Sequence, residues 1–359
     1  MLRWALLVTG VLCACDPPRP LAPDGPLPPD APTPCMRGPL TMTVTTLAGC
    51  EQSGIEDGDR NTARFSNPTS VELGPNGAVF IADFDNNRVR RIEADGTTTT
   101  LVARDDFARP FGLLYAGGST LYVQTDDNDS LEHTDNTGTV WNVDIDTGTA
   151  TVITRNAGRP RGLALLGDGR IAMSDHVHHT LTILDPTTGI VTPLAGLADT
   201  PGMVNANGLD ARFAQPYDLA INADGDLLVT ELDNHKIRKV TLAGVVTDYA
   251  GSGVAGSFDG AVAVASFDGP QAIAIAPDNT IFVTDIQRSF IRKIKDGVVS
   301  TIAGDGTRGW IDSEEPRGAR FYGLEGIAVD DSRIIIGDGN RGDGMTFHRV
   351  RTIDRASLP

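Results

Sequence analysis

Histidines are the first residues in this sequence whose chemistry can be named, because His176, His178 and His179 fall in one short segment. Three protein ligands, often imidazoles, together with one open position make a catalytic zinc site. Asp175 and Glu231 would add carboxylate ligands and support metal-dependent hydrolysis or elimination. Alternation along an extended chain places at most two of the three histidines on one side, so a local surface cluster is the simpler interpretation.

A second candidate for metal chemistry is the acidic segment 126–136, which carries five carboxylates. Asp126, Asp127 and Asp129 supply the hard oxygen ligands that calcium prefers. Their spacing matches no calcium-loop pattern, and the segment lacks the glycine on which such loops turn. A solvated acidic loop is therefore the favoured interpretation. Calcium and zinc both stay open, and the sequence establishes no cofactor.

Charge and composition narrow the functional classes. The 359 residues contain 47 acidic and 30 basic side chains, which gives a net charge of −17 at pH 7. A nucleic-acid-binding surface needs clustered Lys and Arg to neutralise phosphates, so this balance argues against a nucleic-acid partner. Two GxGxxG segments, at 251–256 and 304–309, precede no expected helix. They are therefore connections between strands rather than dinucleotide sites.

Six copies of one phrase make up the fold that must position these residues. Each copy has a proline, a short apolar strand, a turn and a second apolar strand that ends in a polar residue. The proline and that last residue are fifteen positions apart in five copies, and Leu324 and Asp338 are fourteen apart in the sixth. The prolines are Pro68, Pro110, Pro160, Pro216 and Pro270. Such a constant offset marks a structural repeat.

Two further strands complete each copy. A basic and apolar strand follows, as in RVRRI from Arg88 and KIRKV from Lys236, and then a fourth strand, as in VVSTIAG from Val298. Four antiparallel strands repeated six times predict an all-β, six-bladed β-propeller. The sixth copy lacks its fourth strand, whereas an unassigned strand of matching sequence occurs at 41–49. We therefore expect this N-terminal strand to close the ring in the last blade.

The repeats resemble those of the NHL-repeat family of six-bladed propellers. The resemblance rests on blade starts similar to Pro-x-Gly, on the phrases DFDNNRV from Asp83 and ELDNHKI from Glu231, and on AG…DG…AxF connections. It covers residues 40–354, and blades two and six depart most from the pattern. Membership of this family implies a fold and leaves the activity open.

One end of the ring is expected to carry the functional surface. In an antiparallel blade, the connection before the first strand and the connection from the second strand to the third lie at the same end, and here these are the long segments. Binding and catalytic residues occur preferentially on such loops. The candidate ligand-binding residues are Phe84, Asp175, His176, Tyr217, Glu231 and Trp310. Acids that recur from blade to blade, such as Asp83 and Asp285, are expected to bond the turn that follows them.

The N-terminal residues are predicted to be a targeting signal that directs export and is not part of the folded domain. Residues 1–14 resemble a bacterial lipoprotein signal peptide, because Arg3 precedes a short apolar stretch and a small residue precedes Cys15. Cys15 would then carry the lipid. The alternative is an ordinary secretory signal with a different cleavage site. Either signal implies export, and the lipid would place the protein at the bacterial cell envelope, in the periplasm or at the cell surface.

Two further segments complete the expected domain organisation. Residues 15–35 contain the lipidated cysteine and a proline-rich, extended tether, and residues 36–359 form the propeller. Cys35 and Cys50 are expected to form a disulfide in the oxidising compartment that export implies. The alternative is two free thiols.

The favoured function is a lipid-anchored propeller that binds a protein, peptide or glycan through its loop-rich acidic face and reaches the membrane only through its lipid. The alternative is a metal-dependent lyase or hydrolase at the mouth of the central channel, with Glu231, Asp175 and His176 as ligands. A purely architectural role is the third possibility. The sequence contains no nucleophile elbow, and this favours binding over catalysis.

Overall fold

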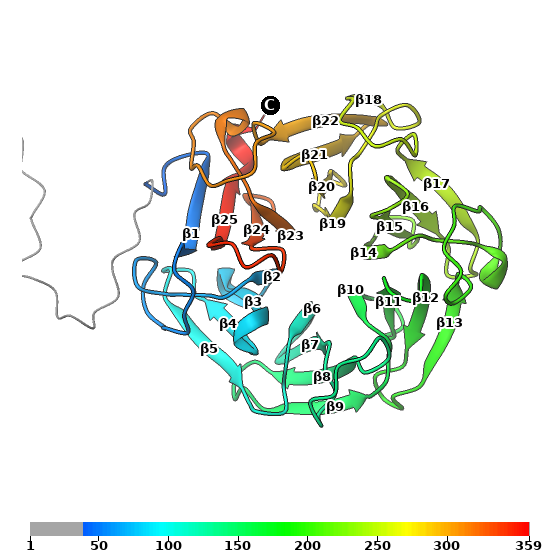
Figure 1. Cartoon of the computed structure of the whole chain (residues 1–359), viewed down its shortest axis with the longest axis horizontal. Helices are drawn as coiled ribbons and strands as arrows, with labels where there is room; N and C mark the ends of the chain where they lie inside the picture. Colours follow the sequence, from blue (N-terminus) through cyan, green and yellow to red (C-terminus); the bar gives the residue numbers. More distant parts are fainter. Residues whose placement is uncertain (1–38, 359) are drawn as a thin grey trace, which may run out of the picture. The chain divides into compact units, whose positions relative to one another are not determined.

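A computed structural model describes residues 39–358, and within them six antiparallel sheets stand in a ring around a common centre (Figure 1). We number the sheets as blades 1 to 6, in the chain order of their innermost strands. The all-β, six-bladed propeller expected from the repeats is therefore confirmed. No helix among these residues is long and apolar enough to cross a bilayer.

Blades 1 to 4 follow the chain from the centre of the ring outwards. Blade 1 contains β2 (Pro68–Leu73), β3 (Val79–Asp83), β4 (Arg88–Ile92) and β5 (Thr98–Ala103). Blade 2 contains β6 (Pro110–Gly117), β7 (Thr120–Thr125), β8 (Thr139–Asp144) and β9 (Ala150–Thr154). Blade 3 contains β10 (Pro160–Leu165), β11 (Ile171–Asp175), β12 (Thr180–Leu184) and β13 (Val191–Ala195). Blade 4 contains β14 (Pro216–Ile221), β15 (Leu227–Glu231), β16 (Lys236–Val240) and β17 (Val246–Ala250).

Blades 5 and 6 depart from this plan at their outer edges. Blade 5 contains β19 (Pro270–Ile275), β20 (Ile281–Asp285), β21 (Phe290–Lys295) and β22 (Val298–Ala303), with the short β18 (Gly260–Ala261) paired outside β22. Blade 6 contains β23 (Gly323–Val329), β24 (Arg333–Gly339), β25 (His348–Asp354) and β1 (Val44–Cys50). Short 3-10 turns are η1 (Pro75–Gly77), η2 (Phe84–Asn86), η3 (Gly208–Asp210), η4 (Pro316–Gly318) and η5 (Arg355–Ser357).

The N-terminal strand closes the ring, as the sequence predicts. In Figure 1 the blue strand β1 lies beside the red strand β25, and Val44 stands opposite Ile353. The pairing removes the open edges that the first and last strands would otherwise present. Cys50, the last residue of β1, is disulfide-bonded. The predicted partner Cys35, the lipidation residue Cys15 and the predicted signal peptide and tether lie outside the described residues.

The constant offset in the sequence is the register of the first two strands. Pro68 stands opposite Asp83 in blade 1. The other blades repeat this pairing as Pro110 with Thr125, Pro160 with Asp175, Pro216 with Glu231, Pro270 with Asp285 and Leu324 with Asp338. A residue at a fixed distance after the proline therefore occupies the same place in every blade.

A buried ion pair explains why the acid recurs. Arg90 and Asp83 both have side chains that are 0 % exposed, and Nη1 lies 2.9 Å from Oδ2. Asp83 also accepts hydrogen bonds from Asn86 in the following turn and from the backbone N–H of Ser66. The other blades with this arrangement have Arg238 with Glu231, Arg292 with Asp285, and Arg351 with Asp338. The predicted bond from the acid to the turn that follows it is confirmed for Asp83, Asp175 and Glu231, whereas Asp285 and Asp338 bond the backbone before the first strand instead.

An aromatic ring packs against each of these arginines. Phe65, three positions before the proline of blade 1, is fully buried, and the guanidinium carbon of Arg90 lies 5.1 Å from its ring centroid. Phe213, Phe267 and Phe321 repeat the contact in blades 4, 5 and 6. Burying one such ring contributes roughly 1.5–3 kcal/mol. The phrase in the sequence is thus a packing unit of phenylalanine, arginine and acid.

Candidate functional site

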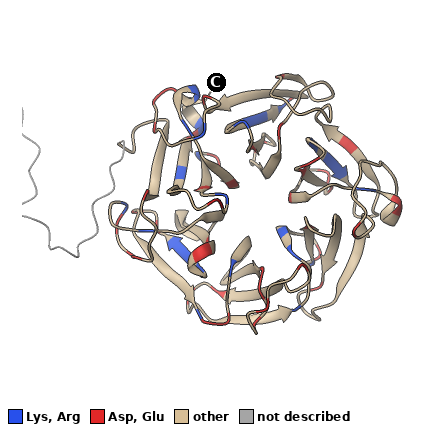
Figure 2. Cartoon of the chain, viewed as in Figure 1, with Lys and Arg blue, Asp and Glu red and all other residues tan. Residues whose placement is uncertain are grey.

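The innermost strands enclose a cavity of about 80 Å³ near the ends at which they begin, where the long connections meet. Its wall contains residues of all six innermost strands, from Ser70 on β2 to Ile327 on β23. The loops around it carry acidic and basic residues side by side, whereas Lys and Arg dominate the third strands β4, β16 and β21 (Figure 2). We call the cavity and the residues around its opening the channel mouth.

Two positions of the repeat give the channel mouth its chemistry. The residue directly after the aligned proline differs in every blade: Thr69, Phe111, Arg161, Tyr217, Gln271 and Glu325. Two positions later, every blade has an aliphatic residue: Val71, Leu113, Leu163, Leu219, Ile273 and Ile327. Four of these aliphatic residues also line a second, more apolar cavity of about 400 Å³ on the side of the tight turns. An aliphatic ring therefore separates the polar mouth from an apolar funnel.

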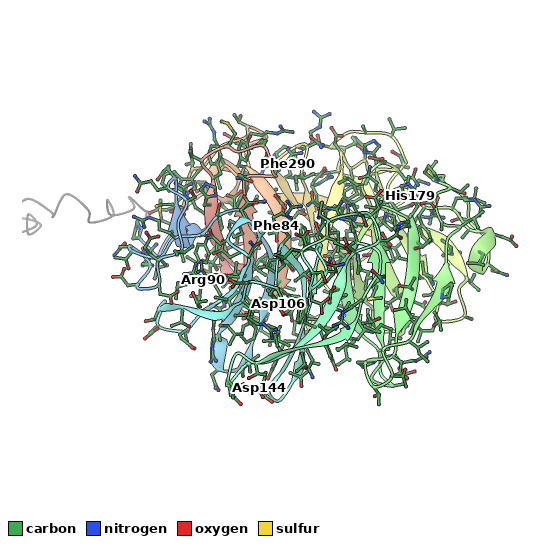
Figure 3. The ribbon with its side chains drawn as sticks, turned by 60° about the horizontal axis from the view of Figure 1, so that its bottom comes forward. Phe84, Arg90, Asp106, Asp144, His179 and Phe290 are labelled. Atoms are coloured by element: carbon green, nitrogen blue, oxygen red, sulfur yellow. The ribbon has the colours of Figure 1, made fainter. Side chains whose placement is uncertain are left out.

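Aromatic rings from four blades meet at the channel mouth. Phe84 and Phe111 lie edge to face with their centroids 6.0 Å apart, and Tyr217 is 5.8 Å from Phe111. His176 completes the group at 5.4 Å from Tyr217. Figure 3 labels Phe84 near the middle of the view and Asp144, at the end of β8 in blade 2, at the lower edge. The rings form an apolar wall with a phenol and an imidazole as its polar edges.

A fixed charge cluster lies behind this wall. Asp126 is fully buried and accepts hydrogen bonds from both terminal nitrogens of Arg161, at 2.6 and 3.0 Å, and from Arg159 at 2.8 Å. Burial opposes ionisation, but the two guanidinium groups hold the pKa of Asp126 well below its usual range. Arg161 also lies over Phe111, with 4.0 Å from its guanidinium carbon to the ring centroid. The cluster fixes the aromatic wall in place.

The imidazole of His176 is neutral. Its Nδ1 lies 2.9 Å from the backbone carbonyl of Arg159, and because a carbonyl only accepts, Nδ1 carries the proton. Burial, reinforced by repulsion from Arg161, lowers the pKa of His176 to about 3. Nε2 is consequently a hydrogen-bond acceptor at physiological pH.

The structure brings together three of the six predicted ligand-binding residues. Phe84, His176 and Tyr217 share the channel mouth. Asp175 instead accepts a hydrogen bond from Nδ1 of His178 at 2.7 Å, and Glu231 is buried against Arg238 in blade 4.

Trp310, the sixth predicted residue, lies at the ring closure. Its indole N–H donates to Thr46 on β1 at 2.8 Å, and Arg349 on β25 lies 4.1 Å from its ring centroid. The indole therefore holds the closing strand against its neighbour and lies away from the channel mouth.

The acidic segment of blade 2 does not gather its carboxylates around one point. Asp126 faces Arg161 and Arg159, Asp127 lies 2.6 Å from Nδ1 of His133, and Asp129 pairs with Arg155. Within residues 39–358, no group of three or more His, Cys, Asp or Glu side chains is placed to hold a metal ion. Each acid of the predicted metal set is occupied by a different cation or imidazole.

Most of the remaining histidines link one blade to the next. His179 and His235 adopt left-handed backbone conformations just before their third strands, and Nδ1 of each accepts the backbone N–H of a residue in the following blade, Gln215 and Gly269. His348 accepts in the same way from Asn67, and Asn87 does so through Oδ1 in blade 1. Histidine recurs here because its Nδ1 accepts a hydrogen bond where the side-chain oxygen of Asn does.

Sequence reasoning missed Phe111, Arg161 and Glu325, which line the channel mouth with Tyr217. The signal was present in the aligned first strands. Reading down the position after the proline shows six different residues, whereas the position two further on is aliphatic throughout. A variable position inside a regular repeat marks the site better than the acidic insertion or the histidine cluster.

No protein-family model matches this chain. Human NHL repeat-containing protein 2 is 27 % identical over 210 residues, which cover 56 % of this chain and 25 % of the human protein. Protein SUPPRESSOR OF QUENCHING 1, chloroplastic, from Arabidopsis thaliana is 26 % identical over 182 residues, which cover 50 % of this chain and 14 % of that protein. The matched regions thus span a quarter or less of each relative's length.

Solved structures share the fold over most of the chain. A Bacteroides thetaiotaomicron protein of unknown function superposes with a TM-score of 0.70 at 21 % identity, covering 87 % of this chain and 75 % of its own. An auxiliary nutrient binding protein from the same organism gives 0.67 at 19 %, covering 86 % and 75 %. A streptogramin B lyase gives 0.54 at 13 %, covering 85 % and 97 %. Likeness at these identities shows the propeller fold alone.

Proposed function

We propose that this chain, an NHL-repeat six-bladed propeller, binds a ligand at the channel mouth on its loop-rich face. The observation that carries the proposal is the meeting of Phe84, Phe111, His176 and Tyr217, from four blades, over a buried charge cluster. Concave sites with apolar walls and a few oriented polar groups are typical of ligand binding. Structural neighbours described as nutrient-binding proteins support a binding role.

The size of the cavity limits what enters it. About 80 Å³ accommodates one small group, so the bulk of a ligand would rest on the surrounding loops. A peptide or glycan with one side chain or substituent directed into the mouth fits this shape, as does a loop of a partner protein. The aromatic edges suit the apolar face of a sugar or the stem of a side chain.

We also propose that the protein acts at the cell envelope, held there by lipid on Cys15. The support is the sequence alone: a short apolar segment, a small residue before the cysteine and the proline-rich stretch after it. Metabolic labelling with a clickable palmitate analogue should mark the wild type, and Cys15→Ser should lose both the label and membrane fractionation. Equal labelling of the variant would overturn the proposal.

The binding proposal is tested with the purified chain on peptide and glycan arrays, followed by titration of the hits. Phe84→Ala removes one face of the aromatic wall and should weaken binding by about tenfold, the scale on which truncating an aromatic contact acts. Asp224→Asn, in an exposed tight turn at the other end of blade 4, is the matched control. Binding that Phe84→Ala and the control affect equally would exclude the channel mouth.

The alternative function, a metal-dependent lyase or hydrolase, needs Glu231, Asp175 and His176 to share an ion. Each of the three already has a different partner, namely Arg238, His178 and the carbonyl of Arg159. Nothing in the described part of the chain favours this alternative over binding.

A further inference from the structure

Three carboxyl groups from three blades line the cavity of the channel mouth: Glu72 on β2, Asp218 on β14 and Glu325 on β23. Two of them are clear departures from the repeat. At the place of Glu72 the other blades have leucine or alanine, and at the place of Asp218 they have glycine, serine or alanine. Acids at positions that are otherwise small or apolar are not part of the shared blade plan, although Glu72 and Asp218 each accept a backbone hydrogen bond from the following blade.

The three acids also differ from the acids inside the blades. Asp83, Glu231, Asp285 and Asp338 each pair with a buried arginine. Among residues 39–358, no ion pair joins Glu72, Asp218 or Glu325 to a cation. A buried carboxylate without a cation is costly, so such a group either keeps its proton or receives a positive partner.

Ionisation without a cation is most costly for Glu325, because it is the most buried of the three acids. Its side chain belongs to a residue that is 7 % exposed, and Oε1 has no hydrogen-bond partner. The backbone N–H of Arg341 bonds its carboxyl group. Asp218 accepts from the backbone of Leu219 and of Ile273, at 2.8 and 2.9 Å. The cavity therefore contains one acceptor that is buried and unused.

The charges around the cavity leave it short of positive charge. Arg161 lines the same wall, but both its terminal nitrogens bond Asp126. Arg161 nevertheless attracts Glu325, Arg341 attracts it from the loop side, and Asp85 repels it. The other titratable groups nearby are Arg159, next to Asp126, the neutral imidazole of His176, and the phenol of Tyr217, which burial keeps protonated by raising its pKa. Once the three acids ionise, negative charge exceeds positive charge.

Burial acts on all three acids in the same direction. It raises the pKa of Glu72 to about 8, of Glu325 to about 7 and of Asp218 to about 6. Without a cation, Glu72 therefore keeps its proton at pH 7, Glu325 is about half protonated, and Asp218 is largely ionised. A cation that enters the cavity would favour the ionised forms and release those protons.

We infer that the channel mouth binds the protonated nitrogen of its ligand, an ammonium group on an apolar stem, with Glu325 as its principal partner and Glu72 and Asp218 as the surrounding charge. The inference rests on the proposed binding function and names the chemistry of the group that enters. A cavity of about 80 Å³ holds an ammonium group and excludes a whole sugar ring. The aromatic wall of Phe111 and Tyr217 takes the stem, and aromatic faces attract cations.

The test uses benzylamine as the probe and benzyl alcohol as its neutral analogue, titrated calorimetrically into the full chain. Benzylamine should bind and benzyl alcohol should not. The affinity should rise from pH 5 to pH 8 as the acids ionise, and the heat should depend on the buffer because protons are released. Glu325→Gln should weaken benzylamine by about tenfold or more, the scale of a hydrogen bond to a charged group. Asp224→Asn should leave the affinity unchanged.

A second variant, Glu72→Gln, guards against a folding artefact, and thermal melting of each variant shows that it is folded. Equal binding of benzyl alcohol, no binding of benzylamine, or benzylamine binding that neither Glu325→Gln nor Glu72→Gln weakens would each overturn the inference. These failures are distinct from failure of the proposed function. An array ligand that Phe84→Ala weakens and Glu325→Gln does not would leave the binding site in place and exclude the cation.

Discussion

The backbone N–H of Asn67 donates to Nδ1 of His348 at 3.1 Å, although the two residues are 281 positions apart in the chain. The bond links the last blade to the first. Nδ1 must be unprotonated to accept it, so protonation of this imidazole would replace an attraction with a clash of two hydrogens. His348 is 5 % exposed, and solvent offers little alternative partner.

Acid should therefore weaken the ring at this link. Burial, with Arg349 adding repulsion, lowers the pKa of His348 to about 4 from an ordinary value of 6.5. The unfolded chain binds this proton first, so the link's contribution to stability is present above pH 6.5 and is lost as the pH falls towards 4. His348→Asn should lose less Tm over this window, because Asn87 accepts the equivalent bond in blade 1 without titrating. His133→Asn, in an exposed loop, should follow the wild type.

The buried pair of Arg90 and Asp83 should behave as one unit. Removing either partner leaves a buried charge uncompensated, and Asp83→Thr or Arg90→Trp alone should cost about 3–5 kcal/mol in the free energy of unfolding. Blade 2 has Thr125 and Trp141 at the same two register positions, joined by an indole N–H bond of 2.9 Å. The double variant should thus recover part of the loss.

Urea unfolding of the two single variants and the double variant measures this coupling as a double-mutant cycle. If the losses of the two single variants simply add, the Trp–Thr pair of blade 2 cannot replace the Arg–Asp pair of blade 1. The same cycle at Arg238 and Glu231, which form the same buried pair in blade 4, provides an independent repeat.

Glu72 should lower the stability of the protein as the pH rises from about 4.5 to about 8. Burial raises its pKa to about 8 from an ordinary value of 4.5, against the opposing hydrogen bond from the backbone of Tyr115. As the pH rises, the unfolded chain loses this proton first. The contribution of Glu72 to stability is therefore complete below pH 4.5 and falls between pH 4.5 and about pH 8. Glu72→Gln cannot ionise. Its Tm should exceed that of the wild type by an amount that grows from pH 5 to pH 8, with no such trend for Asp224→Asn.

The purified protein should retain no stoichiometric calcium or zinc. Asp126, Asp127 and Asp129 have separate partners in Arg161, His133 and Arg155, and calcium needs six to eight oxygens around one point. Elemental mass spectrometry before and after dialysis against a chelator measures the content. About one ion per chain that survives dialysis would contradict this prediction and support the alternative function, a metal-dependent lyase or hydrolase.

The repeat made the number of blades, and the four antiparallel strands of each blade, predictable. The interval from Pro68 to Asp83 recurs along the chain and marked the repeat, and the structure adds that these two residues stand opposite each other on adjacent strands. The orphan strand at 41–49 likewise had one vacant place to fill, in the blade that ended without a fourth strand. Repeats make a fold predictable because every copy encodes the same local structure, so features shared by all copies reveal the strands of one blade.

The site was predictable only in part, and the reason is physical. Glu231 and Trp310 have the composition of site residues, but whether an acid or an indole faces a ligand depends on its neighbours in space. Arg238 lies seven positions on from Glu231 and takes its charge, whereas Thr46, which bonds Trp310, comes from the far end of the chain. Glu325 was overlooked for the converse reason, since its lack of a cation is visible only when the blades are assembled.

The closure of blade 6 also sets an order of events. Strand β1 is among the first parts of the domain to be synthesised, whereas its partner β25 is nearly the last. Strand β1 therefore stays unpaired while the intervening blades form. During that interval an apolar strand with free backbone groups is open to wrong partners, which include the outer edges of the other blades. Long-range closure of this kind is slow, and the ring acquires its full cooperativity only in the final step. The propeller is therefore most vulnerable to aggregation while it is one strand short of complete.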